Sequence, residues 1–221
     1  MKPSKQLPAD TNYQHFRDFF TRASAARSVE DILAELRRYA RYYVAYAHGR
    51  EERPKLAESF ARLRQLVDVA TPVILRLYDC FDRAKTLTED AFREGVELLE
   101  SYVFRRSVSD MQTRSLGQIF ASMAYRVSDE QPLASLKVAL ARQAKTRRFP
   151  SDDEFRAALA TRDIYDMRNR KYLLDRLEND SKEKIDTSSF TIEHVLPQNE
   201  NLDPEWQKML GPDWKTIQNV W

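Results

Sequence analysis

The chain has 221 residues, of which 42% are hydrophobic and 11% aromatic, so it can bury a core in one large domain or in one domain and a smaller unit. Its 36 basic and 34 acidic residues nearly cancel, so the net charge gives no indication of a nucleic-acid partner. Only four glycines are present, which disfavours a sheet-rich fold and a glycine-rich phosphate loop, because both need residues that tolerate positive φ.

The chain contains one cysteine, Cys80, so an intramolecular disulfide and a C-x-x-C metal or redox site are both excluded. Cys80 lies in the apolar run VILRLYDCF, which predicts a buried and unreactive thiol. The N-terminal segment MKPSKQLPAD lacks the apolar stretch of a signal peptide. No window approaches the roughly 18 apolar residues of a membrane span. We therefore expect a cytoplasmic protein with no membrane partner.

Apolar residues at three- and four-residue spacing predict nine helices in chain order. The first begins at about Asn12, and Ser28 caps the second, which ends at about Gly49. The apolar face of the second helix is expected to comprise Ile32, Leu33, Leu36, Tyr39, Tyr43 and Tyr46. Later helices are expected to begin near Pro54, Thr71, Thr88, Asp110, Pro132, Ser151 and Asp163. Such aromatic-rich stripes are more typical of a core than of a cofactor site.

The composition changes after Glu178, where the polar run NDSKEKIDTSS begins. The following SFTIEHVL is typical of a short extended segment, and Asp203-Pro204-Glu205 indicates a new helix start. We therefore expect a helical domain over residues 1–180 and a second, mixed unit over residues 181–221.

Glu193 and His194 form an acid–histidine pair near the end of that extended segment. A histidine can act as a general base near neutral pH, and a carboxylate beside it can bind a hard divalent cation. From spacing alone, a histidine in a partly apolar stretch is more often one that only satisfies local hydrogen bonds.

The run IEHVLPQ, residues 192–198, resembles the opening motif of HNH (ββα-metal) nucleases, in the variant found at the C-terminus of GmrSD-type restriction endonucleases. The helical segments LESYVFRR (99–106) and YLLDRLE (172–178) are similar to recurring segments of the same proteins. The resemblance implies a mainly α fold followed by a partial ββα-metal unit. It also implies His194 as the general base, Glu193 as a ligand of Mg²⁺ or another divalent metal, and foreign or modified DNA as the substrate.

The family pattern continues with a second strand and a further helix that have no evident copy before Trp221. One carboxylate does not define a catalytic metal site, so we expect this chain alone to bind the metal incompletely and to be inactive. It resembles a truncated piece that lacks the other half of the nuclease and the N-terminal nucleotide-binding domain. The alternative is a non-catalytic helical interaction module with a relic or split nuclease motif.

Basic residues are enriched in the middle of the chain, and Lys145, Arg147 and Arg148 form the densest cluster. Lys and Arg neutralise phosphates, so these three are the candidate contacts to DNA phosphate. They are expected at the C-terminal end of a helix, where cations are favourable for another reason, so an ordinary solvated face is the competing interpretation.

Overall fold

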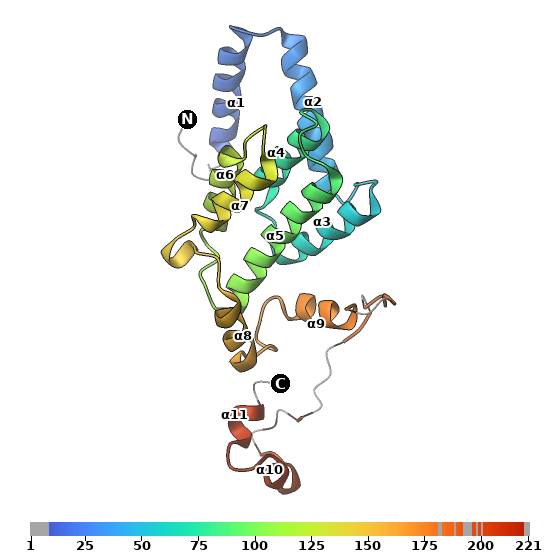
Figure 1. The fold of residues 1–221 in the computed structure, drawn as a ribbon, viewed down its shortest axis with the longest axis vertical. Helices are drawn as coiled ribbons and strands as arrows, with labels where there is room; N and C mark the ends of the chain where they lie inside the picture. The colour runs from blue at the N-terminus through green and yellow to red at the C-terminus, as the bar shows by residue number, and fades with distance from the viewer. Residues whose placement is uncertain are drawn as a thin grey trace. The chain divides into compact units, whose positions relative to one another are not determined.

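The computed structural model describes residues 9–180, 183–187, 189–191, 196, 197, 199 and 201–218. Within these ranges it contains eleven α-helices and one 3-10 turn, and no β-strand (Figure 1). The helices are α1 (Ala9–Ser24), α2 (Val29–Ala47), α3 (Pro54–Leu66), α4 (Thr71–Asp82), α5 (Glu89–Val108), α6 (Leu116–Arg126), α7 (Pro132–Ala141), α8 (Asp152–Thr161), α9 (Arg170–Glu178), α10 (Pro204–Leu210) and α11 (Trp214–Gln218), with the 3-10 turn η1 (Lys145–Arg147).

The mainly helical prediction is therefore confirmed. The extended segment expected in SFTIEHVL shows no strand at its described residues, 189–191 and 196, and its other residues lie outside the described ranges. The partial ββα unit stays a prediction. In the part of the chain that the structure describes, no helix combines the length and the apolar character needed to cross a bilayer.

Several helix starts follow the predicted capping chemistry. The Ser28 hydroxyl accepts a hydrogen bond from the Asp31 backbone N–H at 3.1 Å, and the Ser151 hydroxyl accepts one from the Glu154 N–H at 3.3 Å. Each bond satisfies one of the donors that the first turn of a helix leaves unpaired. The predicted prolines also stand in the first turns of α3, α4 and α7.

Two predicted starts are wrong, and in both places an aspartate forms a turn instead. Asp110 has φ 54°, a left-handed conformation that ends α5 and delays α6 until Leu116. The Asp163 carboxylate accepts hydrogen bonds from the Tyr165 and Asp166 N–H groups at 2.9 and 3.2 Å. This local turn competes with the helix, and α9 begins only at Arg170. The first helix also begins earlier than expected, at Ala9 rather than Asn12.

The chain divides into two compact units, one of Met1–Val103 with Gln112–Phe149 and the other of Phe104–Met111 with Pro150–Trp221. We call them the first and second units. In the first unit, α4 packs against α2 and α6, α6 packs against α7, and α2 also contacts α3. The predicted boundary between residues 180 and 181 is not itself tested by this division.

The core of the first unit contains a cluster of aromatic rings. Phe60 is fully buried, and its ring centroid lies 5.1 Å from Tyr46, 5.6 Å from Phe92 and 6.2 Å from Tyr78. Two of these pairs are T-shaped, a favoured geometry for aromatic rings. Large buried rings supply much of the apolar area that drives folding of a helical domain.

The predicted apolar face of α2 is only partly buried. Ile32, Tyr42 and Tyr46 are at most 2% exposed, whereas Leu33, Leu36 and Tyr43 are 38–57% exposed. At about 100° per residue, the exposed positions adjoin the buried ones: Tyr43, Leu36 and Leu33 lie about 20°, 40° and 100° round the helix from Ile32, on the side away from Tyr42 and Tyr46. The predicted face is thus one wide apolar stripe, of which the structure buries only one side. On α1, the aromatic residues Tyr13, Phe16 and Phe19 are likewise exposed.

A buried carboxylate connects three parts of the first unit. Asp79 on α4 is 2% exposed and lies 2.8 Å from Arg83, 3.4 Å from Arg38 of α2 and 3.8 Å from Arg76. Arg76 also donates to the Val127 carbonyl oxygen at 2.9 Å. The hydrogen bond to Asp79 and the carboxylate's charge raise the pKa of Arg83. The surrounding arginines compensate for the cost of burying this charge.

Cys80 is fully buried next to Asp79, as the sequence predicts. Its thiol sulfur lies 3.9 Å from the Ser128 carbonyl oxygen. Burial raises the pKa of the Cys80 thiol to about 11. Since the thiolate is the reactive form, this thiol is a structural rather than a nucleophilic group.

The second unit has a smaller core. The ring of Phe104, from the last turns of α5, lies 5.8 Å from Phe155 of α8 and 5.0 Å from Tyr172 of α9. Arg105 forms an ion pair with Asp152 at 2.5 Å. Among the described residues of this unit, the buried hydrophobic side chains are those of Met167, Tyr172, Leu173 and Leu202, together with Val108 from α5. This unit contains the segment on either side of the acid–histidine pair.

Candidate functional site

The predicted catalytic pair falls in a segment that the structure does not describe. Glu193 and His194 belong to residues 192–195, which lie outside the described ranges, so their roles as metal ligand and general base stay predictions. The residues on both sides of this segment are described, and they define the local framework of the candidate site.

Upstream of the pair, side chains of α9 hold the chain that leads into the motif. The Thr187 hydroxyl donates to the Asp175 carboxylate at 2.7 Å, and the Lys171 ammonium donates to the Thr187 carbonyl oxygen at 2.9 Å. Lys171 also pairs with Asp175 at 3.3 Å. One residue, Thr187, is therefore held through both its side chain and its backbone.

A second bond acts two residues earlier, where the Asn179 side-chain oxygen accepts from the Ile185 N–H at 2.7 Å. The same amide donates through its nitrogen to the Asp175 carbonyl oxygen at 3.1 Å. Asn179 thus joins the end of α9 to the returning chain. A hollow of about 220 Å³ lies against this region, lined by Lys171, Leu174, Asp175, Glu178, Thr187, Phe190 and Thr191.

Downstream of the pair, Gln218 of α11 bonds to the backbone of two described residues. Its side-chain nitrogen donates to the Pro197 carbonyl oxygen at 2.6 Å and to the Asn199 carbonyl oxygen at 3.0 Å. Gln218 is 7% exposed, so these bonds are largely shielded from water and replace its lost hydration. Gln207 of α10 donates to the Leu202 carbonyl oxygen at 2.6 Å. The chain after the motif is therefore fixed by two glutamine side chains.

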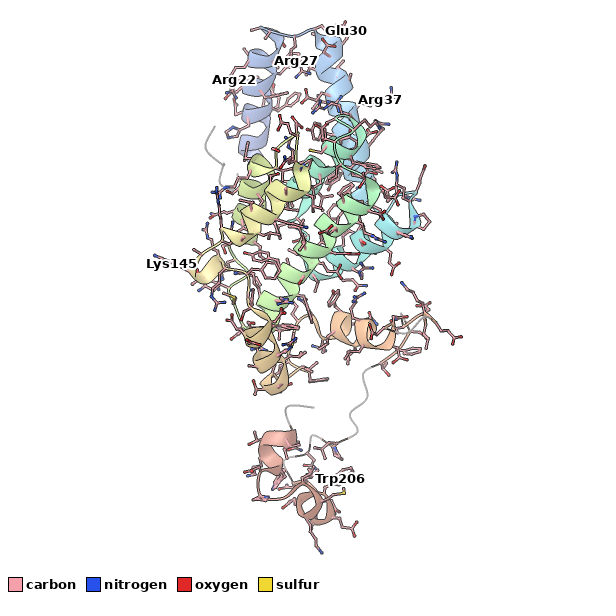
Figure 2. All side chains as sticks on the ribbon, viewed as in Figure 1. Arg22, Arg27, Glu30, Arg37, Lys145 and Trp206 are labelled. Atoms are coloured by element: carbon pink, nitrogen blue, oxygen red, sulfur yellow. The ribbon has the colours of Figure 1, made fainter. Side chains whose placement is uncertain are left out.

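Helix α10 begins where the sequence predicts. The Asp203 carboxylate accepts from the Glu205 N–H at 2.9 Å, Pro204 is the first helical residue, and Gly211 with φ 79° follows the last. Trp206 lies on this helix (Figure 2). The sequence reasoning missed Gln218, Gln207, Asn179 and Thr187, because polar residues in short or polar segments carry no periodic signal for what they bind.

The described residues contain no group of three His, Cys, Asp or Glu side chains close enough to hold a metal ion. Glu193, the one predicted ligand, lies outside those ranges. The site for Mg²⁺ or another divalent metal is thus a prediction from the motif.

Lys145, Arg147 and Arg148 occupy η1 and its C-terminal end in the first unit, and all three are exposed. The prediction that they end a helix is wrong, because α7 stops at Ala141 and a separate 3-10 turn follows. Lys145 has φ 53°, a left-handed conformation that reverses the chain there. Figure 2 shows Lys145 on this turn.

Hydrogen bonds to two side chains, those of Tyr102 and Gln118, hold this turn. The buried Tyr102 hydroxyl donates to the Arg147 carbonyl oxygen at 2.6 Å, and Arg147 itself donates to the Gln118 side-chain oxygen at 3.4 Å. Next to it in sequence, Arg142 lines a surface hollow of about 710 Å³ together with Arg126. Neither Arg126 nor Arg142 forms an ion pair with a described residue. The sequence gives no sign that these two arginines share a hollow.

The fold is helical in the described residues, and hydrogen bonds hold the chain on both sides of residues 192–195. Residues 149–221 match the family model of the C-terminal domain of GmrSD restriction endonucleases. The match covers the second unit from α8 onward, including Glu193 and His194. No curated protein and no solved structure matches the chain.

Proposed function

We propose that this chain takes part in metal-dependent cleavage of DNA by a restriction endonuclease of a defence system. The observation that carries the proposal is the match of residues 149–221 to the GmrSD C-terminal domain, which includes the IEHVLPQ run. Restriction endonucleases act on DNA, so foreign or modified DNA is the proposed substrate.

In this proposal His194 is the general base that takes a proton from the attacking water. An imidazole suits this role because its ordinary pKa, about 6.5, lies close to neutral pH. Glu193 supplies a carboxylate oxygen to Mg²⁺ or a similar ion, which stabilises the charge that develops on the phosphate oxygens.

The described framework supports this assignment of roles. Residues 192–195 lie between two anchored segments, one fixed to α9 through Thr187 and one fixed to α11 through Gln218. A catalytic group works best on backbone whose flanks are held by hydrogen bonds, because misplacement of the group reduces the rate.

The turn with Lys145, Arg147 and Arg148 is the proposed phosphate contact. Its cations are exposed, and its backbone is anchored by Tyr102. Replacing all three by Ala should lower the slope of log K against log salt by about 3, since each phosphate contact contributes about 0.9. Fluorescence anisotropy of labelled DNA over a salt series measures this slope. Arg17→Ala with Arg22→Ala, which removes two exposed cations of α1, is the control and should leave the slope unchanged.

The catalytic proposal is tested by plasmid nicking with the product of the complete natural gene, in Mg²⁺ or Mn²⁺. We expect His194→Ala to lower the nicking rate by roughly 100-fold or more. His15→Ala, which removes an exposed histidine of α1, should leave it unchanged. Nicking by His194→Ala at the wild-type rate would contradict the proposal.

The second candidate function is a non-catalytic helical interaction module. It is favoured by the exposed apolar side chains of α1 and α2, which a solitary soluble domain has no need to present. A chain that associates with another polypeptide, and neither binds nor cleaves DNA, would favour this candidate over the nuclease.

A further inference from the structure

Helix α2 carries a wide apolar stripe with two adjoining faces, and only one of these faces is buried within the chain. The buried face contains Ile32, Tyr42 and Tyr46, each at most 2% exposed. The other contains Leu33 at 57% exposed and Leu36 at 38%. An apolar face that the chain itself leaves exposed is a candidate surface for a partner.

The exposed face of α2 follows a strict repeat. Its residues are Val29, Leu33, Leu36, Ala40 and Tyr43, and all five are exposed. The steps between them are four, three, four and three residues, which is the spacing of the a and d positions in a coiled coil. We call this set the α2 seam. Such a seam is built to pack against another helix in a knobs-into-holes manner.

Helix α1 adds exposed rings to the same hairpin. Tyr13, Phe16 and Phe19 are 67%, 46% and 37% exposed. Figure 1 shows α1 and α2 as the two arms of this hairpin, and they are in contact within the first unit. The Ser28 cap and an ion pair between Arg27 and Glu35, at 2.5 Å, fix the start of the second arm.

The exposed apolar area is large enough to support an interface. With about 200 Å² for each aromatic side chain, the exposed parts of Tyr13, Phe16, Phe19 and Tyr43 alone amount to about 400 Å². The aliphatic seam residues add to this value. A standard interface buries about 800 Å² on each partner, so the hairpin supplies a substantial share.

Two charges beside the α2 seam indicate which partner fits it. Glu30 and Arg37 are exposed, lie seven residues apart on α2, and form no ion pair with any other described residue (Figure 2). Both follow a seam residue by one position, Glu30 after Val29 and Arg37 after Leu36, so they flank the same edge of the seam. One is acidic and one is basic. When two copies of the helix lie antiparallel, opposite charges therefore meet along this edge.

We propose that a second copy of this chain covers the α2 seam, with the two α2 helices antiparallel about a twofold axis between Leu33 and Leu36. In this arrangement Leu33 of each copy packs against Leu36 of the other. Glu30 of each copy then lies beside Arg37 of the other, so the ion pair forms twice, as an isologous interface requires. The rings of α1 extend the buried surface. This inference depends on the hairpin alone and is independent of the nuclease proposal.

The first experiment measures mass against concentration by analytical ultracentrifugation of residues 1–221. We expect a monomer–dimer equilibrium in the wild type. Leu33→Glu combined with Leu36→Glu should raise the dimer Kd by roughly 100-fold, since both residues are central to the seam. Leu177→Glu, at a 64% exposed leucine of α9, is the matched control and should leave the Kd unchanged. A wild type that stays monomeric at every soluble concentration overturns the proposal. That outcome is also the one expected if α1 of the same chain covers the α2 seam.

The second experiment tests the antiparallel register through charge exchange. Glu30→Arg and Arg37→Glu should each weaken dimerisation, because each places like charges side by side. The double exchange restores opposite charges in both pairs and should return the Kd to within a few-fold of wild type. Residues 30 and 37 are about 10 Å apart along one helix, too far for an ion pair within a copy, so recovery reports a contact between copies. Additive losses in the double variant would overturn the antiparallel arrangement.

Discussion

The two units of this protein are stabilised in different ways. In the first unit, fully buried rings such as Phe60 and a buried carboxylate, Asp79, pack between several helices. In the second unit from α9 onward, the chain is held mainly by side chains that bond to backbone atoms, such as Gln218 to Pro197 and Lys171 to Thr187. The match to a restriction endonuclease domain covers residues 149–221, which include all of this lightly packed part together with α8. Most of the packed core therefore lies in the first unit, whereas the candidate chemistry lies in the second.

The sequence provides separate optical probes for this comparison. All three tryptophans, Trp206, Trp214 and Trp221, lie in the second unit. Tryptophan fluorescence therefore follows the C-terminal part, whereas far-ultraviolet circular dichroism follows mostly the long helices of the first unit. Urea unfolding monitored by both signals distinguishes a change in one unit from a change in both.

The largest expected effect is loss of a core ring from the first unit. Phe60→Ala should lower the free energy of unfolding by about 3–5 kcal/mol, because the ring is fully buried and the cavity collapses incompletely. The dichroism transition in urea measures this loss. Phe190→Ala is the matched control in the second unit, where the ring is 55% exposed, and should change stability by less than about 0.5 kcal/mol. Equal losses would contradict the contrast between the units.

Removal of the buried carboxylate is expected to have the next largest effect. Asp79→Ala should cost about 3 kcal/mol, since Arg38, Arg76 and Arg83 lose their shared anion. Asp153→Ala in α8 removes a 99% exposed carboxylate that lies 3.7 Å from Arg156, and should cost less than about 0.5 kcal/mol. Chemical denaturation of both variants tests the difference, and a mild Asp79→Ala would show that the arginines find other partners.

Two tyrosines of α2 should respond in opposite ways to loss of the hydroxyl. Tyr42 donates to the Asp82 carboxylate at 2.8 Å, so Tyr42→Phe should cost about 1–2 kcal/mol. The buried Tyr46 hydroxyl has no hydrogen-bond partner among the described residues, so Tyr46→Phe should cost nothing or stabilise slightly. Urea midpoints of the pair decide this, and a destabilised Tyr46→Phe would reveal a partner for that hydroxyl.

The pKa of Tyr46 predicts how the stability of the first unit changes at alkaline pH. Burial raises the pKa of Tyr46 to about 12, above the value of about 10 for an unfolded tyrosine. The unfolded state therefore releases its proton first, and the contribution of this residue to stability is complete below pH 10 and is lost as pH rises toward 12. Tyr46→Phe should show a smaller loss of stability over this range, measured by urea midpoints at each pH.

Smaller losses than those in the core are expected from two equivalent caps, one in each unit. Ser28→Ala and Ser151→Ala each remove one side-chain bond at a helix start and should cost about 1 kcal/mol. Hydrogen exchange of backbone amides should show the loss in the first turns of α2 and α8, respectively. Faster exchange of α2 in Ser151→Ala would show that the two units unfold together.

The sequence predicted the parts of the fold that local chemistry decides. Ser28, Pro54, Thr71-Pro72, Pro132 and Ser151 all begin helices, because caps and first-turn prolines act within one turn of the chain. It failed at Asp110 and Asp163, where an aspartate can begin either a helix or a turn. It also failed to divide the apolar residues of α2 into a buried and an exposed stripe, because that division depends on which neighbours the fold provides.

At the candidate site, too, the sequence predicted the local motif but not the tertiary contacts around it. The motif around Glu193 and His194 was visible in the sequence, and the family match includes it. The residues that hold its flanks, such as Gln218 and Thr187, were not foreseen, because their partners are backbone carbonyls and side chains up to 21 residues away. The shared hollow of Arg126 and Arg142 likewise depends on tertiary packing.

The buried thiol of Cys80 makes the protein convenient for labelling chemistry. With a pKa of about 11, only about one thiol in ten thousand is ionised at pH 7, and the sulfur is fully shielded from reagents. Since it is the only cysteine of the chain, a cysteine introduced at an exposed position becomes the single group that a maleimide or a nitroxide spin label modifies. One such label per copy is enough to measure distances between copies by electron paramagnetic resonance, without first removing the native cysteine.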